Sequence, residues 1–235
     1  MPSLISNSLQ VLKLKNTYLS QLQPNVFRRL PNLIYVLLAR NHRLSLKIRA
    51  GEFVTSDSLK TIDLSFCNMA TLELDGFPDL ITVNLRGNMI QQLNSDSFRN
   101  NAELENIDLS LNAISSIATN TFERLKRLKH VDLSFNMISR IERETFSSND
   151  ILTYINLSRN YIGRFNKIIG KSISHLNMSW CEIMHIDTDA LTGMPDLQEL
   201  DLSNNLMSYI PEYWMSDSLQ TIDLSMCRFV TYNII

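Results

Sequence analysis

Residues 104–138 read LENIDLSLNAISSIATNTFERLKRLKHVDLSFNMI and contain two consecutive copies of the pattern LxxLxLxxNxL. In the first copy, Leu104, Ile107, Leu109 and Ile114 fill the apolar positions, and an asparagine fills the ninth. The second copy starts at Leu128. Around the fourth and sixth positions, apolar and polar residues alternate, as they do in a half-buried strand. The stretch therefore predicts one short strand per copy.

The pattern recurs along nearly the whole chain. Its first, leucine-type positions are residues 9, 33, 59, 80, 104, 128, 152, 173, 197 and 219, at intervals of 21 to 26 residues. These intervals are typical of leucine-rich repeats and fall outside those of helical-pair or propeller repeats. A single coil cannot bury its apolar edge, so stacked coils share one core. We predict fold class α/β: a right-handed leucine-rich repeat solenoid, or horseshoe, with a parallel β-sheet on the concave face and short turns or single helical turns on the convex face.

The predicted array consists of ten repeats over residues 9–235, of which the last is incomplete. Residues 1–8 are interpreted as the tail of a preceding repeat, because Ser6-Asn7-Ser8-Leu9 matches Ser56-Asp57-Ser58-Leu59. Neither end resembles the capping units that solenoids need. We therefore expect capping domains, and any signal peptide, anchor or signalling domain, to lie outside this sequence.

The ninth position of each repeat turns the chain inward, and an asparagine amide there can bond backbone groups that the turn leaves unpaired. Three repeats have a cysteine instead, for which we expect a buried structural thiol. Cys181 and Cys227 lie two repeats apart, about 10 Å, which is too far for a disulfide. The predicted turn ladder is Asn41, Cys67, Asn88, Asn112, Asn136, Asn160, Cys181, Asn205 and Cys227.

A second recurring residue lies eighteen positions after the first leucine of the longer repeats. It is Phe27, Phe98, Phe122 and Phe146, with Leu191 in the eighth repeat. We expect these side chains to stack beneath the convex side. Repeats three and seven are short and are expected to lack this phenylalanine, which predicts uneven curvature.

The composition narrows the function classes. The formal net charge is -2, from 22 basic and 24 acidic residues, and provides no general field for nucleic acid or an anionic membrane. No apolar stretch approaches the roughly 18 residues of a membrane span, and the first ten residues lack a signal-peptide pattern. The three cysteines are too few for a disulfide scaffold or an all-cysteine zinc site. We predict no nucleic-acid partner and no direct membrane insertion by this segment.

The 24-residue form LxxLxLxxNxLxxLxxxxFxxLxx, which starts at Leu104 and includes Phe122 and Leu125, resembles the typical extracellular leucine-rich repeat family. That family includes ectodomains of Toll-like receptors, Slit-like guidance proteins and insect surface adhesion proteins. The resemblance covers residues 9–235 and implies binding of a protein ligand or receptor, in adhesion or immune recognition, by a secreted or membrane-anchored protein at the cell surface. The chain departs from the family pattern in its two short repeats and in the absence of cysteine-rich flanking caps.

Two sequons, Asn156-Leu157-Ser158 and Asn177-Met178-Ser179, are candidate N-glycosylation sites. Both asparagines occupy the fifth repeat position, where aspartate followed by Leu-Ser is usual in this chain. Either extracellular glycosylation or a chance exchange of aspartate for asparagine explains them equally well.

The third, fifth and seventh positions of each repeat are expected to face outward from the sheet, with the eighth at its margin. The fifth position forms an acidic stripe, which could meet a basic partner but is also common strand chemistry. Large apolar residues and arginine, which anchor interfaces, gather at the eighth position, although they could also cover the core. The partner-binding candidates are Phe66, Asp108, Leu111, His130, Asp132, Phe135, Tyr154, Arg159 and Trp180.

No catalytic or metal-binding motif stands out. His130, Tyr154 and His175 line up on adjacent strands, which places the two imidazoles about 10 Å apart, too far to share a metal. The serines of the seventh position are a repeat feature without an accompanying base. We therefore predict a non-enzymatic binding module with no cofactor and no metal. The alternative is an intracellular scaffold or regulatory subunit, and a homodimer is compatible with either.

Overall fold

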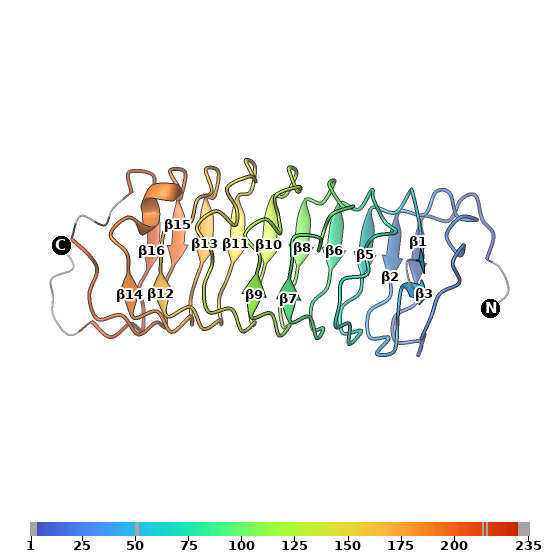
Figure 1. Cartoon of the computed structure of the whole chain (residues 1–235), viewed down its shortest axis with the longest axis horizontal. Coiled ribbons are helices and arrows are strands. Elements are labelled where there is room, and N and C mark those ends of the chain that lie inside the picture. Colours follow the sequence, from blue (N-terminus) through green and yellow to red (C-terminus); the bar gives the residue numbers. More distant parts are fainter. Residues whose placement is uncertain (1–3, 50–51, 213, 215, 230–235) are drawn as a thin grey trace.

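The computed structural model describes residues 4–49, 52–212, 214 and 216–229. Residues 1–3 and 230–235, at the two ends of the predicted array, lie outside the described residues. Ten parallel strands form one sheet in the order of the sequence (Figure 1), and each predicted repeat contributes one strand. They are β1 (Val11–Lys13), β2 (Tyr35–Leu37), β5 (Thr61–Asp63), β6 (Thr82–Asn84), β8 (Asn106–Asp108), β10 (His130–Asp132), β11 (Tyr154–Asn156), β13 (His175–Asn177), β15 (Glu199–Asp201) and β16 (Thr221–Asp223).

Each strand covers the third to fifth positions of its repeat, and neighbouring strands pair without a register shift. Val131 of β10 lies beside Ile155 of β11, which lies beside Leu176 of β13. These fourth-position side chains are buried, as is the sixth-position Leu133. The residues on either side of them point away from the core because successive side chains of a strand alternate between its two faces. Residues at the same position of successive repeats therefore lie side by side and form straight columns across the sheet.

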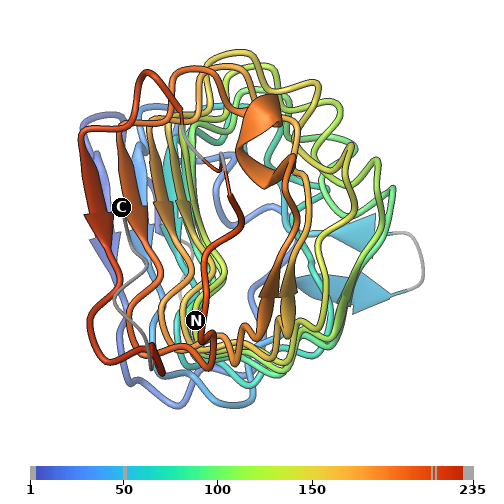
Figure 2. The same ribbon diagram turned by 90° about the vertical axis from the view of Figure 1, so that its left-hand side faces the viewer.

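The wall opposite the sheet consists of turns and short strands (Figure 2). Two parallel pairs lie there, β7 (Gln92–Leu93) with β9 (Ser116–Ile117) and β12 (Arg164–Phe165) with β14 (His185–Ile186). The long second repeat adds an antiparallel pair, β3 (Lys47–Arg49) and β4 (Glu52–Phe53), which projects from this wall.

Helix in the described part of the chain is limited to one 3-10 turn, η1 (Ala190–Gly193). The predicted solenoid of short turns and single helical turns is confirmed.

The phenylalanine spine is present, but the expectation for repeat three is wrong. Ring centroids of Phe98 and Phe122 are 5.9 Å apart and those of Phe122 and Phe146 are 5.4 Å apart, both stacked. Phe77 of repeat three is fully buried, with its ring centroid 6.3 Å from that of Phe27.

Hydrogen bonds and spacing show how the short repeat retains Phe77. Asn101 Nδ2 donates to the Leu74 and Phe77 carbonyls in the way that Asn149 Nδ2 donates to those of Phe122 and Leu125. In this bonding pattern, the carbonyls of Leu74 and Phe77 correspond to those of Phe122 and Leu125. Counted from the first leucine, however, Phe77 lies eighteen residues after Leu59, the same offset as the other phenylalanines of the spine. The short repeat therefore keeps its aromatic ring at the usual offset and lacks three residues between Phe77 and the next first leucine, Leu80.

Candidate functional site

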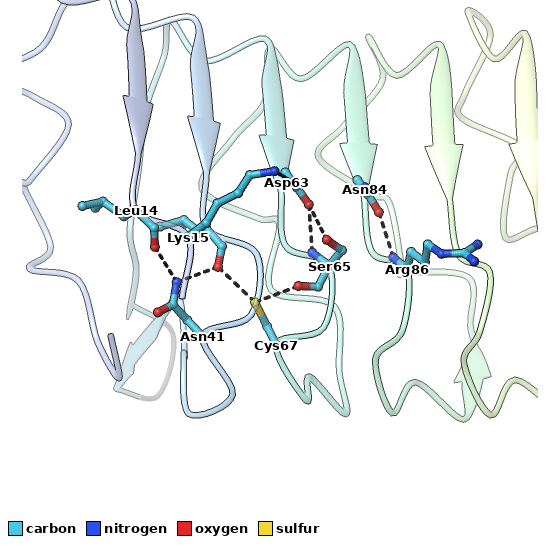
Figure 3. A network of polar contacts seen from close by, with 9 residues as sticks. Leu14, Lys15, Asn41, Asp63, Ser65, Cys67, Asn84 and Arg86 are labelled. Carbon is cyan, nitrogen blue, oxygen red and sulfur yellow. Dashed lines mark hydrogen bonds and ion pairs between the residues drawn. The ribbon is translucent and has the colours of Figure 1, made fainter. Parts of the chain in front are cut away.

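The ninth-position asparagines tie adjacent repeats together. Asn41 Nδ2 donates to the carbonyls of Leu14 and Leu38, at 2.8 and 2.7 Å (Figure 3), and Asn41 Oδ1 accepts the N–H groups of Thr17 and Leu19. The two Nδ2 bonds and a bond from the preceding repeat to Oδ1 recur at Asn88, Asn112, Asn136, Asn160 and Asn205. This ladder fixes the coils against one another and hence the columns on the sheet.

The three cysteines are free thiols in the same column. Each Sγ donates to a carbonyl of the preceding repeat, at 3.4 Å for Cys67, 3.1 Å for Cys181 and 3.3 Å for Cys227. Burial raises the pKa of all three and brings the pKa of Cys181 to about 12. The thiols therefore stay protonated and act as donors, but they lack the amide oxygen that accepts backbone N–H groups elsewhere in the ladder.

The fifth-position side chains cap the backbone where each strand ends. Asp63 Oδ1 accepts the N–H of Ser65 at 3.1 Å, and Asn84 Oδ1 accepts the N–H of Arg86 at 3.0 Å (Figure 3). The same bond to the seventh-position N–H recurs at Asp108, Asp132, Asn156, Asn177, Asp201 and Asp223. The acidic stripe thus has a structural role in the strand ends, and an asparagine fills that role as well as an aspartate does.

The eighth-position residues adopt a left-handed backbone, a feature that the sequence analysis missed. Their φ angles lie between 53° and 67°. Only glycine reaches this region without strain, and asparagine tolerates it better than most residues. The signal was present in the column, which contains one glycine and two asparagines. The column is Asn16, Arg40, Phe66, Gly87, Leu111, Phe135, Arg159, Trp180, Asn204 and Met226.

The left-handed turn aims the eighth-position side chains along the margin of the sheet. Arg159 Cζ lies 5.0 Å from the ring centroid of Phe135 and 4.5 Å from that of Trp180, so the guanidinium lies between aromatic rings from the two flanking repeats. Phe135 and Trp180 remain 44% and 49% exposed, so they do not serve mainly to cover the core. We call Phe135, Arg159 and Trp180 the arginine sandwich.

Phe66 and Leu111, in the same column, are only half-buried and partly cover the surface around them. The Phe66 ring lies over Gly87, where a Cβ atom would come within 2.3 Å of it, and Arg40 Cζ is 6.0 Å from the same ring centroid.

The third-position residues form a second row on the sheet. His130 Nδ1 lies 2.9 Å from Asn106 Oδ1, and the Tyr154 ring centroid is 6.0 Å from that of His130 and 6.4 Å from that of His175. At the far end of the row, His175 Nε2 is 3.6 Å from Glu199 Oε1. Burial, with a smaller effect of Asp132, raises the pKa of Tyr154, so its phenol stays protonated and available as a hydrogen-bond donor.

The structure places all nine partner-binding candidates on the sheet and its margin, in repeats three to eight. It joins Phe135, Arg159 and Trp180 into one cluster and stacks Tyr154 against His130. Phe66 and Leu111 lie nearer the start of the array. Asp108 and Asp132 belong to the capping column.

The two sequon asparagines are half-buried members of that capping column. Asn156 Nδ2 donates to Asp132 Oδ2 at 3.1 Å, and Asn177 Oδ1 accepts from both the N–H and the hydroxyl of Ser179. A glycan on either asparagine would start from the middle of the sheet face.

A further pair of buried asparagines escaped the sequence analysis. Asn101 and Asn149 donate to carbonyls of the preceding repeat on the wall opposite the sheet. Both lie three residues before the first leucine of the next repeat, and this shared offset was the signal that could have found them.

Within the described ranges, no three histidine, cysteine or acidic side chains are placed to hold a metal ion. No helix in that part of the chain has the length and apolarity needed to cross a membrane.

Three features define the class of leucine-rich repeat solenoids: stacked parallel coils, an asparagine ladder, and one strand from each repeat in a single sheet. The chain belongs to the leucine-rich repeat family, which matches residues 7–69, 78–138, 126–183 and 171–229. No curated protein sequence matches the chain significantly.

Solved structures share the fold. Toll from Drosophila, in a glycosylated complex with Spatzle, matches with a TM-score of 0.78 and 21% identity over 94% of this chain and 32% of Toll. Toll-like receptor 13, in a complex with the single-stranded RNA ssRNA13, matches with a TM-score of 0.70 and 21% identity over 96% of this chain and 37% of the receptor. The chain thus spans about a third of the length of these structures.

Proposed function

We propose that this chain is the protein-binding segment of an extracellular receptor or adhesion protein, and that it binds its partner on the sheet face of repeats three to eight. The observation that carries the proposal is the exposed arginine sandwich, with Arg159 Cζ 5.0 Å and 4.5 Å from two half-exposed rings. Aromatic residues and arginine are the side chains that most often dominate binding energy at protein interfaces.

The surroundings of the sandwich support this surface. The His130, Tyr154 and His175 rings lie on the strands of the same three repeats, so repeats six to eight present two aromatic rows. Aromatic side chains give a large contact area for little lost conformational entropy. Backbone hydrogen bonds of the ladder hold both rows in place, which reduces the entropy lost on binding.

Charge favours a protein partner over a nucleic acid. The capping carboxylates of Asp108, Asp132 and Asp201 lie on the same face, and the chain has a formal net charge of -2. Binding to nucleic acid is driven largely by cationic groups that neutralise phosphates, and these carboxylates oppose it. The partner of Toll in the matching structure is Spatzle, whereas that of Toll-like receptor 13 is an RNA, so the test includes both classes.

The test starts from peptides and small domains selected from a displayed library on the folded chain. We expect the selected binders to lose at least about tenfold in affinity when Phe66, Leu111 and Phe135 are replaced together by serine. The matched control replaces the exposed Ile151, Met184 and Tyr209, which lie outside the surface, by serine. Equal binding by wild type and the first variant, with the fold intact, contradicts the proposal. So does tighter binding of a single-stranded RNA than of any selected protein.

The extracellular location rests on the family resemblance. Secretion of the chain behind an added signal peptide, followed by mass spectrometry before and after peptide N-glycosidase treatment, tests it. A folded, secreted product with free thiols supports the location. Retention and misfolding in the secretory pathway, together with correct folding in the cytosol, would favour an intracellular scaffold.

A further inference from the structure

We propose that Arg159 is a preorganised anchor for the carboxylate of an acidic side chain on the protein partner, flanked in that partner by apolar residues. This inference rests on the proposed function and names the chemistry that the arginine sandwich selects.

The guanidinium is held but not neutralised. Its Cζ lies 5.0 Å and 4.5 Å from the ring centroids of Phe135 and Trp180, and among the described residues it forms no hydrogen bond and no ion pair. Its edge therefore keeps the planar fork of N–H donors that binds a carboxylate in a bidentate manner. Because the two flanking rings restrict the side chain, less entropy is lost when a carboxylate binds.

The charge pattern of the repeats leaves the basic side chains without an acidic neighbour in their own coil. Where the seventh or eighth position is basic, the fifth position is never acidic. Where the fifth position is aspartate, the seventh and eighth positions carry no basic residue. The first group consists of Lys13 with Lys15, Leu37 with Arg40, Asn84 with Arg86, and Asn156 with Arg159. The second consists of Asp63, Asp108, Asp132, Asp201 and Asp223.

Asn156 shows the effect of having asparagine in place of aspartate at the fifth position. Its Oδ1 accepts the N–H of Ser158 at 3.0 Å, the same capping bond that Asp132 forms with Ser134 at 2.8 Å. An aspartate at residue 156 would cap the strand equally well but would place a carboxylate three residues from Arg159. The amide keeps the cap and omits the charge, as Asn177 does in the next repeat.

In the described part of the chain, no nearby carboxylate forms an ion pair with Arg159. Asp132 Oδ1 caps Ser134, and its Oδ2 accepts Asn156 Nδ2. Asp201 Oδ1 caps Ser203, at 2.9 Å. Glu182, two residues after Trp180, is exposed and forms no ion pair within the described residues. None of the three neutralises Arg159.

The rings decide what surrounds the carboxylate. Phe135 and Trp180 offer half-exposed apolar surface on both sides of the guanidinium, so residues next to the acidic side chain gain by being apolar. The role of Asn156 and Asn177 as uncharged caps also accounts for both sequons without a glycan. A glycan on Asn156 would start three residues from Arg159 and crowd the anchor.

The test uses the intrinsic fluorescence of Trp180, since Trp214 is only 3% exposed. The probe is a short acetylated peptide that alternates leucine and glutamate, and its counterpart has glutamine in place of glutamate. We expect a saturable fluorescence change with the glutamate peptide only. Arg159→Gln and Arg159→Lys should each weaken binding by about tenfold or more, because lysine lacks the planar fork. Asn156→Asp should weaken it by about as much with an unchanged unfolding temperature, through the new neighbouring carboxylate.

Arg124→Gln is the matched control, since it removes the same charge from an exposed arginine outside the sandwich. Equal binding of the two peptides, or full binding by Asn156→Asp, overturns the inference. Tighter Arg159-dependent binding of a single-stranded oligonucleotide overturns it as well. If library-selected proteins bind the sheet face but ignore Arg159, this inference fails and the proposed function stands. If they bind elsewhere, the proposed function fails.

Discussion

The Oδ1 atom of Asn136 accepts the backbone N–H of Ile114 in the preceding repeat at 2.9 Å. The Nδ2 atom of the same side chain donates to the carbonyls of Leu109 and Leu133, at 3.0 and 2.9 Å. One buried amide therefore satisfies backbone groups of two successive coils.

Replacing Asn136 by alanine should lower the free energy of unfolding by about 2–4 kcal/mol, because it leaves several buried backbone groups without partners. Urea unfolding measures the loss. Asn120→Ala, at an exposed site, is the control and should change stability by less than about 0.5 kcal/mol. Equal stability of the two variants would show that the ladder does not hold the coils together.

The thiols should differ in reactivity in the order of their burial. The thiolate is the reactive form, so the raised pKa of Cys181, about 12, leaves almost no reactive species at neutral pH. Native protein treated with iodoacetamide and analysed by mass spectrometry should be alkylated first at the half-exposed Cys227, with Cys67 and Cys181 protected until the chain unfolds. Alkylation of Cys181 as fast as that of Cys227 in the native state would contradict this placement.

The Asp63 carboxylate should contribute stability that depends on pH. Burial opposes its ionisation, but hydrogen bonds from Ser65 and Lys15 outweigh burial and lower its pKa below the usual 3.8. The contribution is present above pH 3.8 and is lost as the pH falls through the lowered pKa of the folded state.

Asp63→Asn keeps the cap on the Ser65 N–H but removes the charge that pairs with Lys15 at 2.9 Å. Lys15 is half exposed, so the variant should be less stable at neutral pH by less than about 1 kcal/mol. Urea midpoints of wild type and variant should converge as the pH falls below 3.8. A gap that persists or widens in acid would refute the role of the charge.

The position of the Phe66 ring should depend on the absence of a side chain at Gly87. Its φ of +67° is shared by non-glycine residues of the same column, but a Cβ atom there would lie 2.3 Å from the Phe66 ring. Gly87→Ala should therefore displace the ring and cost about 1–2 kcal/mol, including the left-handed backbone. In a Phe66→Ala background the same substitution should cost clearly less. Additive effects in this double-mutant cycle would show that the ring and the glycine do not interact.

The repeat pattern was sufficient to predict the solenoid, because its apolar spacing fixes which side chains of each coil can be buried. The site was only partly predictable. The columns follow from the repeat, but the arginine sandwich depends on the left-handed backbone of Phe135, Arg159 and Trp180, which a sequence of ordinary residues does not reveal. Phe77 shows the reverse case, because it lies eighteen residues after Leu59, the offset of the other spine phenylalanines, and the sequence was sufficient to predict it.

The capping bonds of the fifth position also lay beyond the sequence. In the sequence, Asp132 and Asn156 differ only in the charge of the side chain. Their bonds to the N–H groups of Ser134 and Ser158 show that both residues cap the end of a strand. Once that shared role is known, the remaining difference between the two residues is the charge beside Arg159.

Hydroxyl-radical footprinting of the chain, free and bound to a library-selected protein, tests whether the partner binds on the sheet face, because it reports the exposure of individual aromatic and methionine side chains. Phe135 and Trp180 should be protected in the complex, whereas the exposed Met184 and Tyr209, outside the surface, should be labelled as in the free chain. Protection of Met184 and Tyr209 with unchanged labelling of Phe135 and Trp180 would contradict binding on the sheet face.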